Sequence, residues 1–419
     1  MSHPGHGTRQ VLGEAVAFLL VALNLRVAVA AVPPVLSDIE HGTGLSSSVA
    51  GLLTTIPILC FGVFAFAAPR LTRHLGVNRL LWLSMLLLAG GIALYLQPSV
   101  AALFTATLVT GAAIAIGNVL MPKVAKRDFG SRAGTMTGLY SMSLFVGAAL
   151  SAGLTVPLES VTGLGWRDVL ALWAVPAILA AAVWGPRVAR REPLPAAAAS
   201  GPGSLTGSLT GPRLRALWRD PVAWAVTVFM GLQSLGYYAM LAWLPTIFTD
   251  HHMAAGQAGW MLSYSSFPGM LSALTTPLLV RRARHAQLTV IAAVVLCAVG
   301  YLGMITDPVP LAYLWMTVLG IGQGATITLA LGFIVARSPD PEHAGQLSTM
   351  AQGVGYLIAC VGPFGLGLLR SVTGGWTVPI LVLTVLLLIE LIAGLLASRH
   401  RHILDTKPAS ARPSSKDGA

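Results

Sequence analysis

The chain has 419 residues, of which 55% are hydrophobic and 10% are charged, and its formal net charge is +11. Soluble domains carry about 25% charged residues, so the composition excludes a soluble globular protein and indicates a polytopic membrane protein. The positive charge alone would also suit nucleic-acid binding, but its distribution along the chain argues for membrane topology instead.

Twelve apolar runs have the length of a membrane span, because a helix of about 20 apolar residues crosses one bilayer core. The first run follows a polar N-terminus and is long enough to span, so we expect it to be retained and not cleaved as a signal. The runs lie near residues 13–33, 47–69, 77–96, 99–121, 133–156, 169–185, 221–244, 257–280, 286–305, 309–336, 344–369 and 376–398.

Arg26 lies in the middle of the first run. A cation at that depth costs about 3 kcal/mol or more, so it must face protein or water. We interpret Arg26 as a substrate-binding residue, because its guanidinium is a fixed fork of donors suited to a carboxylate or another small anion. The alternative is a structural arginine bonded to carbonyls of a neighbouring helix.

The basic residues gather on alternate loops. Of the 26 lysines and arginines, 23 lie in the two terminal segments or in loops that follow even-numbered runs, and the other loops hold only Arg167 and Arg370. The positive-inside rule then places both termini in the cytoplasm. We therefore predict a multi-pass protein of the cytoplasmic (inner) membrane.

Residues 186–220 separate two sets of six runs. Their central part is rich in Gly, Ser, Pro and Ala, which is typical of a flexible linker. We divide the chain into an N-terminal six-helix bundle, a cytoplasmic linker, a C-terminal six-helix bundle and a disordered cytoplasmic tail. Their limits are residues 1–185, 186–220, 221–400 and 401–419.

The two halves repeat each other. Residues 50–73 match residues 258–281 at an offset of 208, and residues 126–134 match residues 337–345 at an offset of 211. Two parallel six-helix repeats around an axis along the membrane normal are the architecture of the major facilitator carriers, which bind substrate near the midplane. We therefore predict an all-α membrane protein of twelve transmembrane helices in two pseudo-symmetric bundles.

The repeat also pairs individual residues. Pro34 and Pro245 each close the first span of their half, 211 residues apart. At the same offset Arg26 corresponds to Tyr237, so the two side chains are expected at equivalent depths, facing the pseudo-axis.

Several strings then form a recognisable set. They are Leu23-Asn24-Leu25-Arg26 in the first span, residues 50–62 in the second, 115–129 in the fourth, 231–245 in the seventh, and 320–324 and 350–356 in the tenth and eleventh. Together they resemble the cyanate-permease and 2-nitroimidazole-transporter family of the major facilitator superfamily, over nearly the whole chain apart from the linker and tails. The resemblance implies that fold and the transport of a small solute by alternating access.

The loop between spans two and three departs from the wider superfamily pattern, which usually carries an Asp before Arg-x-Gly. Here Arg73 takes the Asp position in Arg73-His74-Leu75-Gly76, which puts the usual gating lock in doubt. We therefore assign the inner gate to Arg73 together with the charged string Lys126-Arg127-Asp128.

Further polar residues within the spans are candidates for substrate binding. Gln233 and Tyr237 are four residues apart and share a helical face, as do Gln352 and Tyr356. For each residue the alternative is ordinary interhelical bonding, worth about 0.6 kcal/mol on average. The set is Gln233, Tyr237, Gln323, Gln352, Tyr356 and Asn118, the last with helix–helix bonding and cavity lining as equal alternatives.

Glu390 is the candidate proton site, because proton coupling normally needs a titratable group inside the membrane. Glu14 is the other acidic residue within a span, one residue from its end. For Glu390 the alternative is an interhelical or snorkelling carboxylate, since the twelfth span is peripheral in this fold.

Other chemistry is not indicated. The three cysteines lie in apolar spans without a metal-binding pattern, the histidines form no zinc pattern, and the chain has no Walker motif or nucleophile–base pair. We expect no metal, no cofactor and no enzymatic activity.

We therefore predict a secondary active transporter that moves a small polar or anionic solute, such as cyanate or another small organic anion, across the cytoplasmic membrane. Its expected partners are the small-molecule substrate, the lipid bilayer and, as a candidate, a coupling proton, with no nucleic acid; we expect a monomer. The alternative is an efflux carrier for nitroimidazole-like or amphipathic drugs, in which aromatics of the spans would matter more than Arg26. These are Tyr237, Tyr238, Trp243 and Tyr264.

Overall fold

The computed structural model describes residues 4–189, 216–280, 283–306 and 309–404. Most of the predicted linker and the predicted tail from residue 405 onward lie outside the described residues. Residues 401–404 are placed, and the backbone N–H of Ile403 donates to the carbonyl of Arg337 over 2.9 Å.

The N-terminal half consists of helices. They are α1 (Pro4–Ala30), α2 (Leu36–Thr43), α3 (Ser47–Ala65), α4 (Ala68–Leu75), α5 (Val77–Ala93), α6 (Val100–Phe129), α7 (Ala133–Thr162), α8 (Trp166–Leu172) and α9 (Ala174–Ala189), with the 3-10 turns η1 (Pro33–Val35), η2 (Leu94–Leu96) and η3 (Gly130–Arg132). α9 continues through Pro186 into the predicted linker, where Arg187 is held by a carboxylate of α6.

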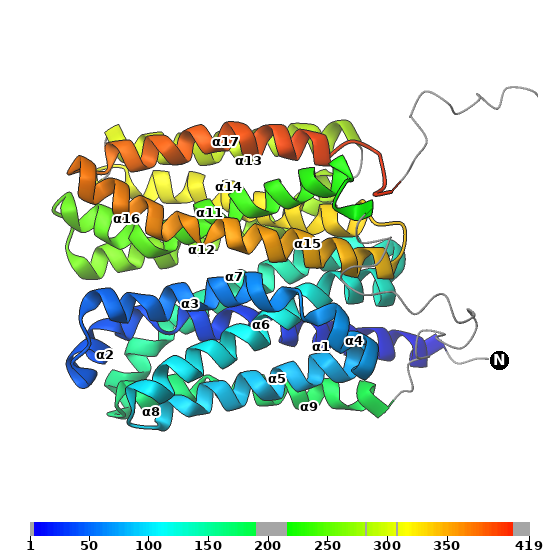
Figure 1. The fold of residues 1–419 in the computed structure, drawn as a ribbon, viewed down its shortest axis with the longest axis horizontal. Helices are drawn as coiled ribbons and strands as arrows, with labels where there is room; N and C mark the ends of the chain where they lie inside the picture. Colours follow the sequence, from blue (N-terminus) through cyan, green and yellow to red (C-terminus); the bar gives the residue numbers. More distant parts are fainter. Residues whose placement is uncertain (1–3, 190–215, 281–282, 307–308, 405–419) are drawn as a thin grey trace, which may run out of the picture.

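The C-terminal half repeats this plan. Its helices are α11 (Pro221–Asp250), α12 (Ala255–Leu279), α13 (Ala283–Thr306), α14 (Ala312–Ala336), α15 (Pro341–Ala359), α16 (Val361–Thr373) and α17 (Thr377–Ala397). In Figure 1 the two halves form two bundles of helices that lie side by side.

Each of the twelve predicted spans coincides with a helix or a broken helix. By length and composition, nine helical segments among the described residues could cross a membrane, or ten if α3 and α4, bent by 58°, count as one span. That count takes Val100–Thr162 as a single segment, although it holds both α6 and α7. The predicted all-α membrane fold in two bundles is thus confirmed.

The halves meet through equivalent helices, as the repeat predicts: α7 packs on α12, and α3 packs on α15. Glycine permits the close approach. A Cβ at Gly138 of α7 would lie 2.5 Å from Cγ of Pro277, and one at Gly62 of α3 would lie 2.8 Å from side-chain carbons of Leu357. Small residues at helix contacts are typical of packing inside membranes.

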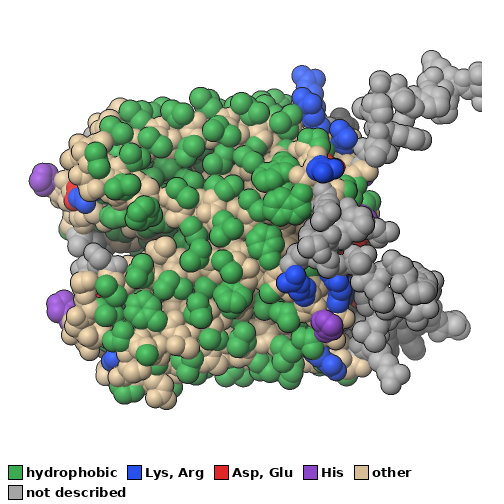
Figure 2. Space-filling model, viewed as in Figure 1, with side chains coloured by type: hydrophobic (Ala, Val, Ile, Leu, Met, Phe, Trp, Pro, Cys, Tyr) green, Lys and Arg blue, Asp and Glu red, His purple; other side chains and the backbone are tan. Residues whose placement is uncertain are grey.

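The outer surface is apolar around the middle of the molecule, and most Lys and Arg side chains gather at one end (Figure 2). We call this end, where α6, α9, α14 and α17 finish, the basic end. α1 starts and α17 finishes there (Figure 1). The opposite end carries the turns after α1 and α11. An apolar girdle of this extent would be a liability in water but matches lipid.

Candidate functional site

Arg26 lies deep between the halves with 5% of its surface exposed. Its Nη1 donates a hydrogen bond to the hydroxyl of Tyr238 on α11. Its Cζ lies 5.2 Å from the centroid of the Tyr238 ring and 5.5 Å from that of Tyr237. Within the described residues no carboxylate pairs with Arg26. The cation is therefore held by aromatic rings and a neutral hydroxyl, and its charge is not neutralised.

Aromatic side chains of both halves continue around this arginine. Tyr356 of α15 lies 6.3 Å from Tyr238 and 5.2 Å from Phe61 of α3, measured between ring centroids. Phe145 of α7 lies 6.2 Å from Tyr237. The site is thus built by α1, α3, α7, α11 and α15, and it exists only where the halves meet.

Two amides lie next to this aromatic cluster. The hydroxyl of Tyr140 donates to Oδ1 of Asn118 over 3.3 Å, and Nε2 of Gln352 donates to the backbone carbonyl of Asn118 over 2.7 Å. Nδ2 of Asn118 and Oε1 of Gln352 are buried without a hydrogen-bond partner in the described part of the chain. Such orphaned polar atoms are costly, and a bound ligand would satisfy them.

A cavity of about 530 Å³ extends from this region to the opposite end. Tyr237, Phe145 and Gln323 line its deep part, and Pro34 and Trp260 line the part nearest the turns. Nε2 of Gln323 is buried and has no hydrogen-bond partner among the residues described. The volume lies within the range of small-molecule sites. Both halves contribute to the wall, as expected for a site on the pseudo-axis.

The sequence-predicted binding residues therefore occupy three places. Tyr237 and Gln323 line the cavity. A second group is buried and does not belong to the cavity wall: Arg26, Asn118, Gln352 and Tyr356. Gln233 is apart from both groups. Its Nε2 donates to the backbone carbonyl of Met230 over 3.1 Å and to the hydroxyl of Ser234 over 2.6 Å, so it is satisfied within its own helix.

The basic end is closed by bonds between the halves. Nζ of Lys123 on α6 lies 2.5 Å from Oε2 of Glu342 on α15. Nζ of Lys126 donates to the backbone carbonyls of Val335, over 2.8 Å, and of Ser338. These carbonyls lie at and just beyond the C-terminal end of α14, where a cation is favourable, so Lys126 caps that end. The cavity is thus open toward one end and sealed at the other.

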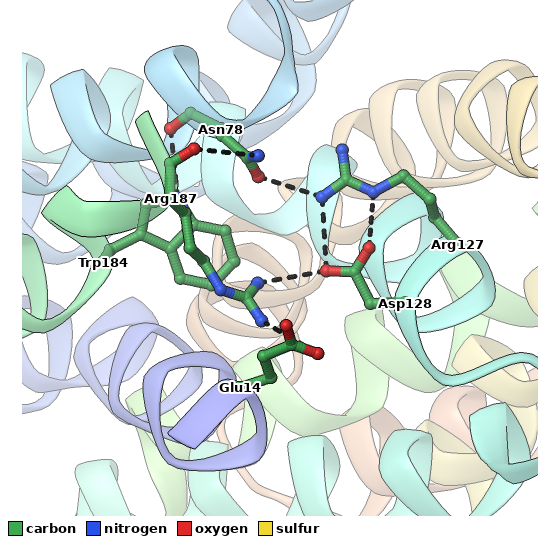
Figure 3. Close-up of polar contacts among 6 residues, drawn as sticks. All are labelled: Glu14, Asn78, Arg127, Asp128, Trp184 and Arg187. Atoms are coloured by element: carbon green, nitrogen blue, oxygen red, sulfur yellow. Dashed lines mark hydrogen bonds and ion pairs between the residues drawn. The ribbon is translucent and has the colours of Figure 1, made fainter. Parts of the chain in front are cut away.

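Arg127 and Asp128 belong to a different set of contacts, and those drawn in Figure 3 join residues of the N-terminal half. Nε of Arg127 lies 2.5 Å from Oδ1 of Asp128, and its Nη2 donates to Oδ1 of Asn78 over 2.9 Å. Nη1 of Arg187 donates to Oδ2 of Asp128 over 3.0 Å, and its Nη2 lies 3.9 Å from Glu14. This network ties α1, α5, α6 and α9 together.

The four predicted gate residues thus separate in the structure. Lys126 bridges the halves, and Arg127 with Asp128 stiffens one half. Arg73 is exposed on α4, with no ion-pair or hydrogen-bond partner in the described ranges. The assignment of these residues to a gate stays a prediction.

Glu390 is buried inside the C-terminal half with 3% of its surface exposed. Its helix, α17, packs against α11, α13 and α16. The carboxyl does not snorkel to the end of α17. A buried carboxyl between helices is compatible with the interhelical alternative, and the assignment of Glu390 as a proton site stays a prediction.

Sequence reasoning missed several members of these clusters. Tyr238 was considered only as a drug-binding aromatic, although it follows Tyr237 directly and lies 212 residues after Arg26. Phe61 and Phe145 carry no signal that separates them from other apolar residues of a span. Asn78 and Arg187 belong to no motif, so only the fold reveals the network of Figure 3.

Comparison with known proteins agrees with this architecture. Residues 15–363 and 236–418 match the family model of the Major Facilitator Superfamily. The chain is 35% identical over 385 residues to the 2-nitroimidazole transporter of Escherichia coli, covering 92% of this chain and 95% of that protein. It is 33% identical over 359 residues to the cyanate transport protein CynX of the same organism, covering 85% and 90%.

A solved structure shares the fold. The crystal structure of the human organic anion transporter MFSD10 superposes with a TM-score of 0.67 and 16% identity, over 91% of this chain and 99% of that one. At this identity the likeness concerns the arrangement of helices alone.

Proposed function

Because the chain belongs to the Major Facilitator Superfamily, we propose that this secondary transporter moves a small organic anion by alternating access and that Arg26 binds the anion's charge. The observation that carries the proposal is the setting of Arg26: 5% exposed, between the halves, with no paired carboxylate among the described residues. A buried charge that lacks a counter-ion is costly. An anionic ligand would supply that counter-ion and gain charge-assisted hydrogen bonds.

The neighbouring groups favour a planar or linear anion. The rings of Tyr237 and Tyr238 lie within 5.5 Å of the guanidinium, and a planar ligand stacks well on aromatic rings. The orphaned Nδ2 of Asn118 and Nε2 of Gln323 add two neutral donors. Cyanate and small aromatic carboxylates have this combination of negative charge and flat or linear shape.

Efflux of a nitroimidazole-like compound is the second candidate, and the aromatic cluster favours it. A nitro group is planar and accepts hydrogen bonds, and a heteroaromatic ring stacks on tyrosine. One relative is named as a 2-nitroimidazole transporter and another as a cyanate transport protein. The two candidates differ in the dependence on Arg26, since a neutral ligand gains less from the charge.

The topology and conformation follow as parts of the proposal. The positive-inside rule would place the basic end in the cytoplasm of a cell whose inner membrane holds the protein. The cavity would then face outward, and the Lys123 and Lys126 bonds would form the closed inner gate, with Arg127 and Asp128 as its support. The bundles over 1–185 and 221–400 would rock as units, joined by the linker, in a monomer.

The test is transport by purified protein in proteoliposomes. Radiolabelled cyanate, benzoate and 2-nitroimidazole would be offered to the parent and to Arg26→Gln, Arg26→Lys and Arg79→Gln. Arg79 is an exposed arginine at the start of α5 and serves as the matched control. We expect saturable uptake of an anion by the parent and Arg79→Gln, and a loss of at least tenfold in both Arg26 variants, because lysine lacks the bidentate fork.

Thermal unfolding of each variant would be measured beside the flux. Parental anion uptake by a well-folded Arg26→Gln protein would contradict the proposed role. Uptake of 2-nitroimidazole alone, unaffected by Arg26→Gln, would favour the second candidate.

A further inference from the structure

The wall of the cavity between the halves is mostly apolar, and none of the described residues that line it is charged. Serines of α12 also line it, but the Ser265 hydroxyl already donates to the carbonyl of Leu262 over 2.7 Å. A triatomic anion is not much larger than a water molecule, whose share of liquid volume is about 30 Å³. It would fill only a small part of a cavity of about 530 Å³. The wall therefore fits a ligand whose larger part is apolar.

A negative charge would be received at the deep end of the cavity. Tyr237 lines the cavity there, and its ring centroid lies 5.5 Å from Cζ of Arg26. The unpartnered Nε2 of Gln323 adds a donor in the deep part. At the other end, which we call the mouth, Pro34 and Trp260 line the wall. The anionic group is therefore expected at the deep end, with the apolar remainder of the ligand extending toward the mouth.

One face of α7 forms a long side of this wall. Its members are three and four residues apart, as on a single helical face, and most are small: Phe145, Ala148, Ala149, Ala152, Gly153 and Val156. Phe145 marks the deep end, since its ring centroid lies 6.2 Å from that of Tyr237. α7 starts at the basic end, so the residues after Phe145 lie toward the mouth. Gly153 comes eight residues later, which is about 12 Å along a helix.

A second glycine of the wall lies at a comparable height on α12, which packs on α7. The Cβ position of Gly269 lies 3.0 Å from Cε1 of Phe145, so these two residues are level. Gly259 comes ten residues before Gly269, about 15 Å nearer the mouth, and it lines the cavity. A Cβ at Gly153 or Gly259 would meet no atom of another helix within 4 Å. The space beside both glycines thus belongs to the cavity and not to helix packing.

We propose that the substrate is an anion with an elongated, flat apolar body and that Gly153 and Gly259 set the length of body that the cavity accepts. This inference rests on the transport function proposed above and adds the substrate class of its site. The anionic group lies at the deep end toward Arg26, and the body extends along α7 toward the mouth. A two-ring aromatic carboxylate buries more apolar surface there than a one-ring carboxylate and therefore binds more tightly. A side chain at either glycine would occupy the place of the second ring.

The test compares two acids that differ in the length of the apolar body, benzoate and biphenyl-4-carboxylate. Isothermal titration calorimetry would give their affinities for the purified full chain in detergent, as the parent, Gly153→Leu, Gly259→Leu and Gly90→Leu. Gly90 is the matched control, because it is an exposed glycine of α5, outside the cavity wall, with an equally open Cβ position. Leucine has a higher helix propensity than glycine, so these changes should not unfold their helices. Gly153→Ala and Gly259→Ala are smaller steps of the same kind.

We expect the parent and Gly90→Leu to bind biphenyl-4-carboxylate at least tenfold more tightly than benzoate. In Gly153→Leu and Gly259→Leu that preference should fall to threefold or less, while the affinity for benzoate stays within threefold of the parental value. The alanine variants should lie between. An undiminished preference for the longer acid in both leucine variants would overturn the proposal. Equal weakening of both acids would overturn it too, because the site as a whole would then be lost.

Two further measurements separate this inference from the proposed function. Parental affinity of Arg26→Gln for both acids would refute the role of Arg26, whereas the glycine variants would still decide what sets the length of the body. Binding of cyanate by a parent that bound neither acid would overturn the present inference and leave Arg26 as the anion-binding residue.

Discussion

At the scale of single residues, Arg26 is stabilised without an opposite charge. The bond to the Tyr238 hydroxyl and the faces of two tyrosine rings replace water around the guanidinium, and a cation over an aromatic ring gains about 0.5–2 kcal/mol. Both rings belong to the other half of the chain. The arginine therefore also contributes to holding the halves in this arrangement.

The two tyrosines offer a matched pair of substitutions. Tyr238→Phe removes the hydroxyl that accepts from Arg26 and retains the ring, and hydrogen bonds to charged groups are worth about 1.5–3 kcal/mol. We expect Tyr238→Phe to lower the free energy of unfolding by about that amount. Tyr237→Phe should change it little, since the Tyr237 hydroxyl has no hydrogen-bond partner among the residues described. Thermal unfolding in detergent measures both, and equal destabilisation of the two variants would contradict the role of the Tyr238 hydroxyl.

The sequence could identify Arg26 and Tyr237 but not their setting. A charge inside an apolar run stands out by its cost, and the repeat offset points to its counterpart. Gln233 shows the limit of this reasoning, because a polar residue on the expected face satisfied itself within its own helix. Which amide remains unpaired depends on side-chain rotamers, and these are set by neighbours far away in the sequence.

At the scale of elements, helix ends at the basic end are fixed by specific side chains. Asp340 caps α15, because its Oδ1 accepts hydrogen bonds from the N–H groups of Glu342 and His343, both over 2.9 Å. Nδ1 of His343 lies 2.7 Å from Oδ2 of the same carboxylate. Partial burial raises the pKa of Asp340, but these hydrogen bonds outweigh it, so the pKa lies below its ordinary value.

This cap gives stability a pH dependence. Because the folded-state pKa of Asp340 is depressed, its contribution is present above the unfolded value of about 3.9 and is lost as the pH falls through the folded value. We expect Asp340→Ala to cost about 0.5–2 kcal/mol at neutral pH and progressively less as the pH falls below the unfolded value of about 3.9. Ser46→Ala is the control, because Ser46 precedes α3 without a side-chain capping bond. A cost independent of pH, measured by thermal unfolding, would count against the carboxylate as the cause.

The spans themselves were predictable from sequence because the bilayer imposes their length. The places where helices break were not. α3 and α4 bend by 58° just before Pro69, which lies in the first turn of α4, and α15 gives way to α16 at Cys360, three residues before Pro363. A proline favours such a break, but Pro57 and Pro122 lie inside continuous helices, so the prolines alone do not say where a span breaks.

At the scale of the whole molecule, the structure has one open end and one closed end. Lys126 donates to two backbone carbonyls of the other half, whereas the Lys123–Glu342 pair involves a carboxylate that is 64% exposed. An exposed ion pair contributes about 0–1 kcal/mol, so Lys126 is the stronger of the two closures. Loss of the Lys126 bonds should therefore destabilise the present conformation more than loss of the Lys123–Glu342 pair.

We therefore expect Lys126→Met to shift the population away from the present conformation by about tenfold or more, and Glu342→Gln to shift it by less. Spin labels on cysteines at Ser160 and His252, both exposed at the opposite end, would report the change by electron–electron distance measurement. As that end closes, a larger share of the molecules should show a short distance between the two labels. If Lys126→Met left the distance distribution of the parent unchanged, Lys126 would not hold the gate.

The network in Figure 3 has a consequence for the order in which the protein is made. Its members Glu14, Asn78, Arg127, Asp128 and Arg187 all precede residue 190. They can therefore find each other before the ribosome has synthesised the second bundle, and domains generally fold as units from the N-terminus. The charges of this network can thus be matched before the second bundle exists, whereas Arg26, Lys123 and Lys126 meet partners that belong to the other half.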